Sequence, residues 1–118
     1  MHASSLGIER RAEPWGDVVT LRGDLDLTNA DQLADALDAT HTRAVVLDLS
    51  AVAFVDSAGI RTIDGIRRRI EDGNRALFIV APAESRAGWT FRVAGIADGV
   101  VLESLDAAMS LAEPADDA

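Results

Sequence analysis

The chain of 118 residues contains no cysteine, no lysine and no tyrosine. The absence of cysteine excludes a disulfide framework, a thiolate metal site and a cysteine nucleophile. All 11 basic residues are arginine, so the chain also lacks the lysine of a P-loop, a Schiff base or a Ser–Lys pair. His2 lies at the terminus, His41 lies in a predicted loop, and neither has an obvious serine partner for a hydrolytic triad. We therefore expect a protein that is not an enzyme and that needs no cofactor or metal.

Positive charge and long apolar runs are also scarce. Asp and Glu number 20 against 11 Lys and Arg, which gives a formal net charge of −9. Nucleic acids and anionic membrane surfaces both attract basic proteins, so neither is an expected partner. No apolar run approaches the roughly 20 residues of a membrane span, and the N-terminus lacks a signal pattern. We expect a cytoplasmic protein whose acidity serves solubility or steers it toward a basic protein partner.

Hydrophobic periodicity predicts one α/β domain, with a core at about 6–112 and an acidic tail at 113–118. Alternating or continuous apolar runs predict strands at 5–13, 19–27, 43–49, 76–81 and 100–102. Helical spacing predicts helices at 28–40, 57–71, 89–94 and 106–111. Thr28 and Asp31 have the spacing of a capping box at the start of the first helix. Strands that alternate with helices predict a sheet with parallel members and helices packed on it.

The segment Val55-Asp56-Ser57-Ala58-Gly59 follows a buried strand and opens a helix. It places a serine hydroxyl beside a carboxylate at a helix N-terminus, where unpaired N–H groups and the helix dipole suit a phosphate. A phosphate on Ser57 adds about −1.5 to −2 charges at neutral pH. The residues alone leave two interpretations open: a phosphorylation switch, or a serine that simply starts the helix, as serine often does.

The helix from Ser57 has two faces when it is wound at about 100° per residue. One face is apolar and is predicted to pack on the sheet: Ile60, Ile63, Ile66 and Ile70. The other face is predicted to meet solvent or a partner: Ser57, Arg61, Asp64 and Arg68. Asp64 and Arg68 have the i,i+4 spacing of an ion pair. Arg61 lies one turn after Ser57, within reach of a phosphate on it.

Three aspartates each lie near the end of a predicted strand: Asp26, Asp48 and Asp56. The carboxyl ends of parallel strands gather at one rim, where ligands usually bind, and three carboxylates there suit Mg²⁺. The simpler interpretation, which we favour, is that each carboxylate caps a turn or a helix. A small-ligand or nucleotide-binding module using this rim stays open as an alternative.

Several motifs resemble those of STAS domains, in particular bacterial anti-sigma factor antagonists of the SpoIIAA and RsbV type. They are Gly23-Asp24-Leu25-Asp26, then Val46-Leu47-Asp48-Leu49-Ser50 with Val55-Asp56-Ser57-Ala58-Gly59, and a weaker match at Phe91-Arg92-Val93-Ala94-Gly95-Ile96. The resemblance covers about Val18 to Leu111. It implies the α/β STAS fold, a small mixed β-sheet with helices packed mainly on one side.

The resemblance also implies partner switching. The unphosphorylated antagonist binds an anti-sigma factor, an ATP-dependent serine kinase of the ATPase-fold type, and thereby frees a sigma factor. The kinase phosphorylates the serine that matches Ser57, the complex separates, and a PP2C-type phosphatase resets the switch. The nucleotide belongs to the partner. The implied partner-binding residues are Asp26, Asp56, Ser57, Ala58, Gly59, Arg61, Asp64 and Arg68.

One residue departs from the family pattern. Family members often carry a small residue, frequently Gly, where Arg61 stands, so Arg61 puts the choice of partner in question. The alternative function is a STAS interaction subunit of a transport or stress-signalling complex, which binds one partner whatever the state of Ser57.

Overall fold

The computed structural model describes residues 6–96 and 99–114. Five strands lie within these residues: β1 (Leu6–Glu13), β2 (Gly16–Leu25), β3 (Ala44–Val55), β4 (Ala76–Val80) and β5 (Val101–Leu102). Four helices lie there as well: α1 (Ala30–Asp38), α2 (Ser57–Asp72), α3 (Arg86–Ala94) and α4 (Leu105–Ala112). Part of the acidic tail predicted at 113–118 lies outside the described residues.

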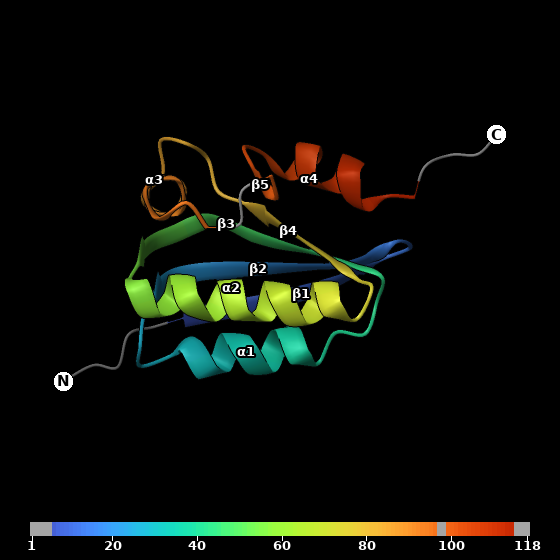
Figure 1. Ribbon diagram of the computed structural model, residues 1–118, viewed down its shortest axis with the longest axis horizontal. Helices are drawn as coiled ribbons and strands as arrows, with labels where there is room; N and C mark the ends of the chain where they lie inside the picture. Colours follow the sequence, from blue (N-terminus) through green and yellow to red (C-terminus); the bar gives the residue numbers. More distant parts are fainter. Residues whose placement is uncertain (1–5, 97–98, 115–118) are drawn as a thin grey trace.

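The strands form one mixed sheet in the order β1-β2-β3-β4-β5. β1 is antiparallel to β2, and the remaining neighbours are parallel. Figure 1 shows α1 and α2 side by side on one side of the sheet and α4 on the other, while α3 lies against β3. The predicted α/β fold with a mixed sheet is confirmed.

The main core lies between the sheet and the helices α1, α2 and α3. The predicted apolar face of α2 is buried in it: Ile60, Ile63, Ile66 and Ile70. A smaller core on the other side of the sheet joins Trp15 to Ala108 and Ala112 of α4. The alternation of helix and strand therefore buries apolar residues on both faces of the sheet, as a parallel sheet requires.

β3 is longer than its sequence predicts, because it runs to Val55 rather than ending at Leu49. Its pairing with β2 shifts twice, between Thr20 and Arg22 and again between Gly23 and Asp24 of β2, and β3 carries an extra residue at each shift. Such bulges break the period of two that marks a strand in sequence. The predicted loop after Leu49 is therefore wrong.

The start of α1 also differs from the prediction. β2 ends at Leu25, so Leu27 lies outside the strand with 77% of its surface exposed. The N-cap position is Asn29, and no side chain caps the helix there. Thr28 instead donates its hydroxyl to Asp26 Oδ1 at 2.6 Å. Local hydrogen bonding to Asp26 has replaced the predicted capping box.

Two further local features concern the end of α2 and the exposure of the tryptophans. Gly73 follows α2 with a φ of −86°, and the residue in the left-handed region is Asn74 at φ 60°. Of the two tryptophans, Trp15 is buried, whereas Trp89 of α3 is 55% exposed. None of the helices in the described residues is long and apolar enough to cross a membrane.

Candidate functional site

Ser57 is the first residue of α2, and its side chain is exposed. The N-cap is the preceding residue, Asp56, whose Oδ1 accepts a hydrogen bond from the Gly59 N–H at 2.8 Å. Within the part of the chain that the structure describes, the Ser57 hydroxyl makes no hydrogen bond. Ser57 does start the helix, but the capping role belongs to Asp56, and the hydroxyl stays available for chemistry.

Asp56 joins two segments that are distant in sequence. Besides Gly59, its Oδ2 accepts from the Leu27 N–H at 3.2 Å, and its own N–H donates to the Leu25 carbonyl at 3.1 Å. A carboxylate can accept several such bonds, and bonds to a charged acceptor are stronger than neutral ones. Asp56 therefore fixes the turn between β2 and α1 against the first turn of α2.

Asp26 and Asn29 stabilise the same turn between β2 and α1. Asp26 Oδ1 accepts from the N–H and the hydroxyl of Thr28, at 2.9 and 2.6 Å. Asn29, which is 2% exposed, accepts from the Asp26 N–H through Oδ1 and donates through Nδ2 to the Asp24 carbonyl. These contacts give the turn a fixed conformation.

Of the three aspartates predicted at strand ends, Asp26 caps a turn and Asp56 caps a helix, whereas Asp48 does neither. Asp48 lies inside β3, opposite Thr20 and Val80, rather than at a strand end, and its Oδ1 accepts from the N–H and hydroxyl of Ser50. Asp26 and Asp56 make the contacts given above. Across residues 6–96 and 99–114, no group of three or more His, Asp or Glu side chains is arranged to hold a metal ion. The capping interpretation therefore holds for Asp26 and Asp56 but not for Asp48, and the described residues give the magnesium alternative no support.

The residues expected to meet a partner do not all lie on the surface. Ser57, Arg61 and Arg68 are exposed, and Ala58 and Asp64 are intermediate. Gly59 is buried, and a Cβ added there would lie 2.9 Å from Leu25 Cγ and 3.0 Å from Val55 Cγ2. The residue therefore allows α2 to approach β2 and β3 closely, and it presents no side chain to a partner.

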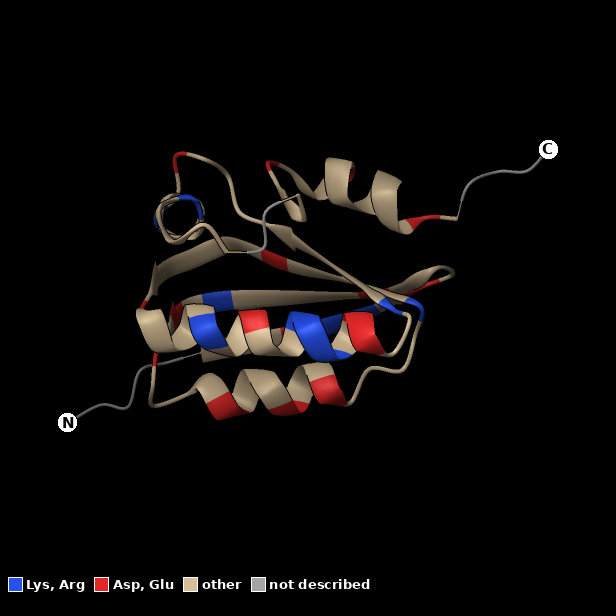
Figure 2. Cartoon of the chain, viewed as in Figure 1, with Lys and Arg blue, Asp and Glu red and all other residues tan. Residues whose placement is uncertain are grey.

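Most of the charges on α2 are already paired. The predicted Asp64–Arg68 pair forms at 2.9 Å, and Asp64 also pairs with Arg67 at 2.8 Å. The hydrogen bond from Arg67 to Asp64 is the main cause that raises the pKa of the guanidinium, and Glu71 adds to it. Arg69 pairs with Asp38 of α1 at 3.2 Å. Figure 2 shows these mixed charges along α2 and acidic positions along α1.

Arg61 differs from these arginines. In the described residues it makes no ion pair or hydrogen bond, although it is exposed one turn after Ser57. Its guanidinium is therefore free to meet an anion at the start of α2.

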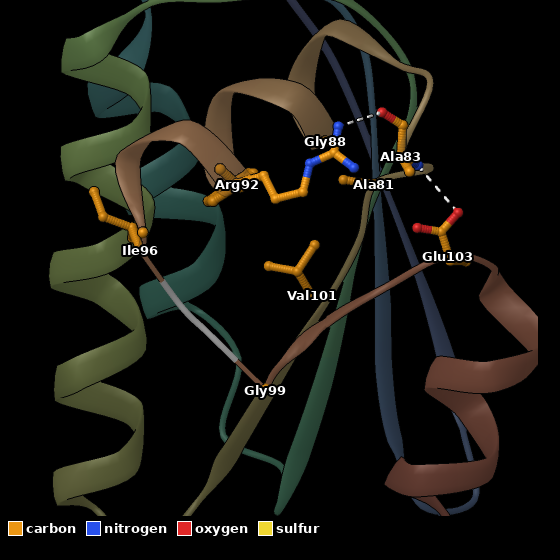
Figure 3. A pocket seen from close by; sticks show the side chains of 10 residues that line it. Ala81, Ala83, Gly88, Arg92, Ile96, Gly99, Val101 and Glu103 are labelled. Carbon is orange, nitrogen blue, oxygen red and sulfur yellow. Dashed lines mark hydrogen bonds between the residues drawn. The ribbon is translucent and has the colours of Figure 1, made fainter.

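A hollow of about 190 Å³ lies elsewhere, between α3, the end of β4 and β5. Figure 3 shows its charged side chains, Arg92 and Glu103, directed to the backbone of Ala83. Arg92 donates to the Ala83 carbonyl at 3.4 Å, and Glu103 accepts from the Ala83 N–H at 3.1 Å. Ligand pockets usually measure about 300–1,000 Å³. The hollow is too small for an ordinary ligand, its charges are engaged, and its lining contains none of the residues around Ser57.

Removal of the Asp56 carboxylate tests its double role. We expect Asp56→Ala to lower the free energy of unfolding by about 1–2 kcal/mol, because it removes a helix cap together with the bond to Leu27. Urea denaturation of Asp56→Ala measures this. Ser104→Ala, which removes only the cap bond of α4 to Ala107, is the matched control with a smaller expected loss. Equal losses in the two variants would show that the bond to Leu27 adds nothing.

Comparison with known proteins identifies the family. The model of the STAS domain matches residues 12–108. The chain belongs to the STAS-domain family. An anti-sigma factor antagonist from Mycobacterium paratuberculosis has a similar structure, with a TM-score of 0.80 and 22% identity over 92% of this chain and 94% of that one. This STAS domain therefore has the fold that its motifs predicted.

Two further proteins resemble it. The anti-sigma factor antagonist SpoIIAA in its unphosphorylated form has a TM-score of 0.70 and 16% identity, over 89% of this chain and 95% of that one. A sulfate transporter from Mus musculus is 42% identical over 55 residues, which make up 47% of this chain. The match spans only 7% of the length of that transporter. The chain is thus similar to nearly the whole length of a small antagonist and to a short part of a much larger transporter.

Proposed function

We propose that this STAS domain is a cytoplasmic anti-sigma factor antagonist that acts by partner switching, as a binding protein and not as an enzyme. Unphosphorylated, it binds an anti-sigma factor that is also a serine kinase, and it thereby frees a sigma factor. The observation that carries the proposal is the exposed Ser57 hydroxyl, which Asp56 relieves of the capping role. The structural likeness to two anti-sigma factor antagonists supports it.

The proposed chemistry takes place on the partner. The Ser57 oxygen attacks the γ-phosphorus of ATP held by the kinase, the bond from that phosphorus to the bridging oxygen breaks, and ADP leaves. The hydroxyl proton passes to a base of the kinase. A PP2C-type phosphatase later transfers the phosphoryl group to water, which restores the hydroxyl and releases inorganic phosphate.

Electrostatic repulsion explains why phosphorylation of Ser57 weakens binding of the partner. Phosphorylation adds about −1.5 to −2 charges next to Asp56, at the end of the molecule that also carries Asp26. A dianion in a packed interface loses hydration and meets these carboxylates. A loss of about 1.4 kcal/mol weakens the complex tenfold, so local repulsion suffices to separate it. The free guanidinium of Arg61 offsets part of the repulsion.

Two substitutions of Ser57 test the proposal. We expect Ser57→Ala to capture a kinase-type ATPase from a lysate of the native host with ATP or ADP added, and Ser57→Asp to bind it at least about tenfold more weakly. Mass spectrometry identifies the partner, and titration calorimetry measures both affinities.

The control is Ser110, an exposed serine of α4 on the opposite face of the sheet. Neither Ser110→Ala nor Ser110→Asp should change the affinity. If Ser57→Ala and Ser57→Asp bind the same partner equally, Ser57 is not a switch.

A second function has its own support. The 42% identity to part of a sulfate transporter favours a STAS interaction subunit of a transport or stress-signalling complex. The same experiment separates the two functions. Such a subunit binds one partner with Ser57→Ala and Ser57→Asp alike, and that partner is not a kinase.

A further inference from the structure

Leu27 is an apolar residue whose side chain is exposed to solvent. It is 77% exposed, more than any other large hydrophobic residue among those described. Its N–H is bound by Asp56, and the turn that carries it is fixed by Asp26 and by the buried Asn29. A turn of this kind ordinarily carries polar residues. The fold thus fixes the backbone at Leu27 while leaving its side chain unpacked.

Phe54 is a second exposed apolar side chain at the same end of the sheet. It is 42% exposed and lies one residue before the end of β3, opposite Asp24 of β2. Leu27 follows the end of β2, which is paired with the end of β3, and Ser57 follows the end of β3. Leu27 and Phe54 therefore accompany Ser57 at the rim formed by the carboxyl ends of these two strands.

The surroundings of these two side chains are acidic. The end of β2, the turn between β2 and α1, the first turn of α1 and the start of α2 carry four carboxylates that are exposed or half-buried: Asp24, Asp26, Asp31 and Asp56. Apolar residues at the centre of a polar rim are the usual arrangement of a protein interface. An acidic rim is complementary to a basic partner surface, and the net charge of −9 favours approach by such a partner.

We propose that Leu27 and Phe54 are the apolar anchors of the surface that docks the anti-sigma factor kinase. The kinase surface that fits them has an apolar pocket bordered by Arg or Lys side chains. This inference rests on the proposed function and extends it, because it assigns affinity to two residues outside the Ser57 motif. The fixed turn strengthens docking, since an anchor that is already ordered loses little freedom on binding.

The test compares three exposed residues. We expect Leu27→Ser and Phe54→Ser each to weaken binding of the captured kinase by about tenfold or more, as truncation of an interface anchor does. Leu111→Ser, at a 55% exposed leucine of α4, is the matched control and should bind as the unmodified chain does. Thermal melting followed by circular dichroism should be the same for all three, because none of these side chains belongs to a core.

Kinetics separate docking from chemistry. For phosphorylation of Ser57, Leu27→Ser should raise KM by about tenfold, because anchors supply uniform binding, and should leave kcat unchanged. Added salt should weaken binding of the unmodified chain, because the acidic rim is screened.

The two proposals fail in different ways. Unchanged affinity and KM in Leu27→Ser and Phe54→Ser, with the unmodified chain binding a kinase, would overturn the anchors and leave the switch in place. Failure of the unmodified chain to capture any nucleotide-binding partner would overturn the proposed function and the anchors with it.

Discussion

Replacement of Phe91 by alanine is expected to lower the free energy of unfolding by about 3–5 kcal/mol. Phe91 is 2% exposed and packs from α3 into the main core, where it is among the largest fully buried or nearly buried side chains. A domain of this size has about 5–15 kcal/mol of stability in total. The variant should therefore unfold at a much lower urea concentration.

Phe54 supplies the control for this prediction. It is 42% exposed, so Phe54→Ala should change stability by less than about 1 kcal/mol. The two variants should then lose different properties: Phe91→Ala loses folding stability, and Phe54→Ala loses affinity for the partner. Equal stability of the two variants would contradict the burial of Phe91.

The second large effect is expected at Gly88, in the first turn of α3. A Cβ there would lie 2.1 Å from the Pro82 carbonyl oxygen and 2.9 Å from that of Ala81. Both obstacles are backbone atoms, so no change of rotamer relieves them. We expect Gly88→Ala to cost about 3 kcal/mol, at the upper end of the usual cost of overpacking, as measured by urea denaturation.

Gly65 is the matched glycine for this experiment. It lies in the middle of α2, and a Cβ there would meet nothing within 4 Å. Gly65→Ala should stabilise the chain by about 0.5–1 kcal/mol, because alanine loses less backbone entropy in a helix than glycine does. A loss of stability in Gly65→Ala similar to that in Gly88→Ala would contradict the steric explanation.

The sequence predicts the regular parts of this fold well. Ile60, Ile63, Ile66 and Ile70 repeat at helical spacing without interruption, and the structure buries all four. The end of β3 was missed for a physical reason, since two extra residues shift its pairing with β2 and remove the alternation that marks a strand. Periodicity therefore predicts an element only as far as its hydrogen-bonding register is continuous.

At the candidate site, too, local sequence patterns predict some features and miss the contacts between distant segments. Local spacing identifies Ser57 as exposed at a helix start, and it identifies the pair of Asp64 and Arg68. The bond from Leu27 to Asp56 links residues 29 positions apart, and no local pattern contains it. The alternation that continues from β2 to Leu27 predicts a strand there instead, although β2 ends at Leu25. The capping box predicted at Thr28 does not form, because the Thr28 hydroxyl donates to Asp26 instead.

The bond between Leu27 and Asp56 also limits how this surface can be transplanted. A peptide that spans only the turn between β2 and α1 would keep Leu27 but lose the carboxylate that orients it, because that carboxylate lies 29 residues later. The peptide would have to order itself on binding and would bind more weakly. Engineering a foreign scaffold to imitate this surface therefore requires both segments, with an aspartate placed to reach each of them.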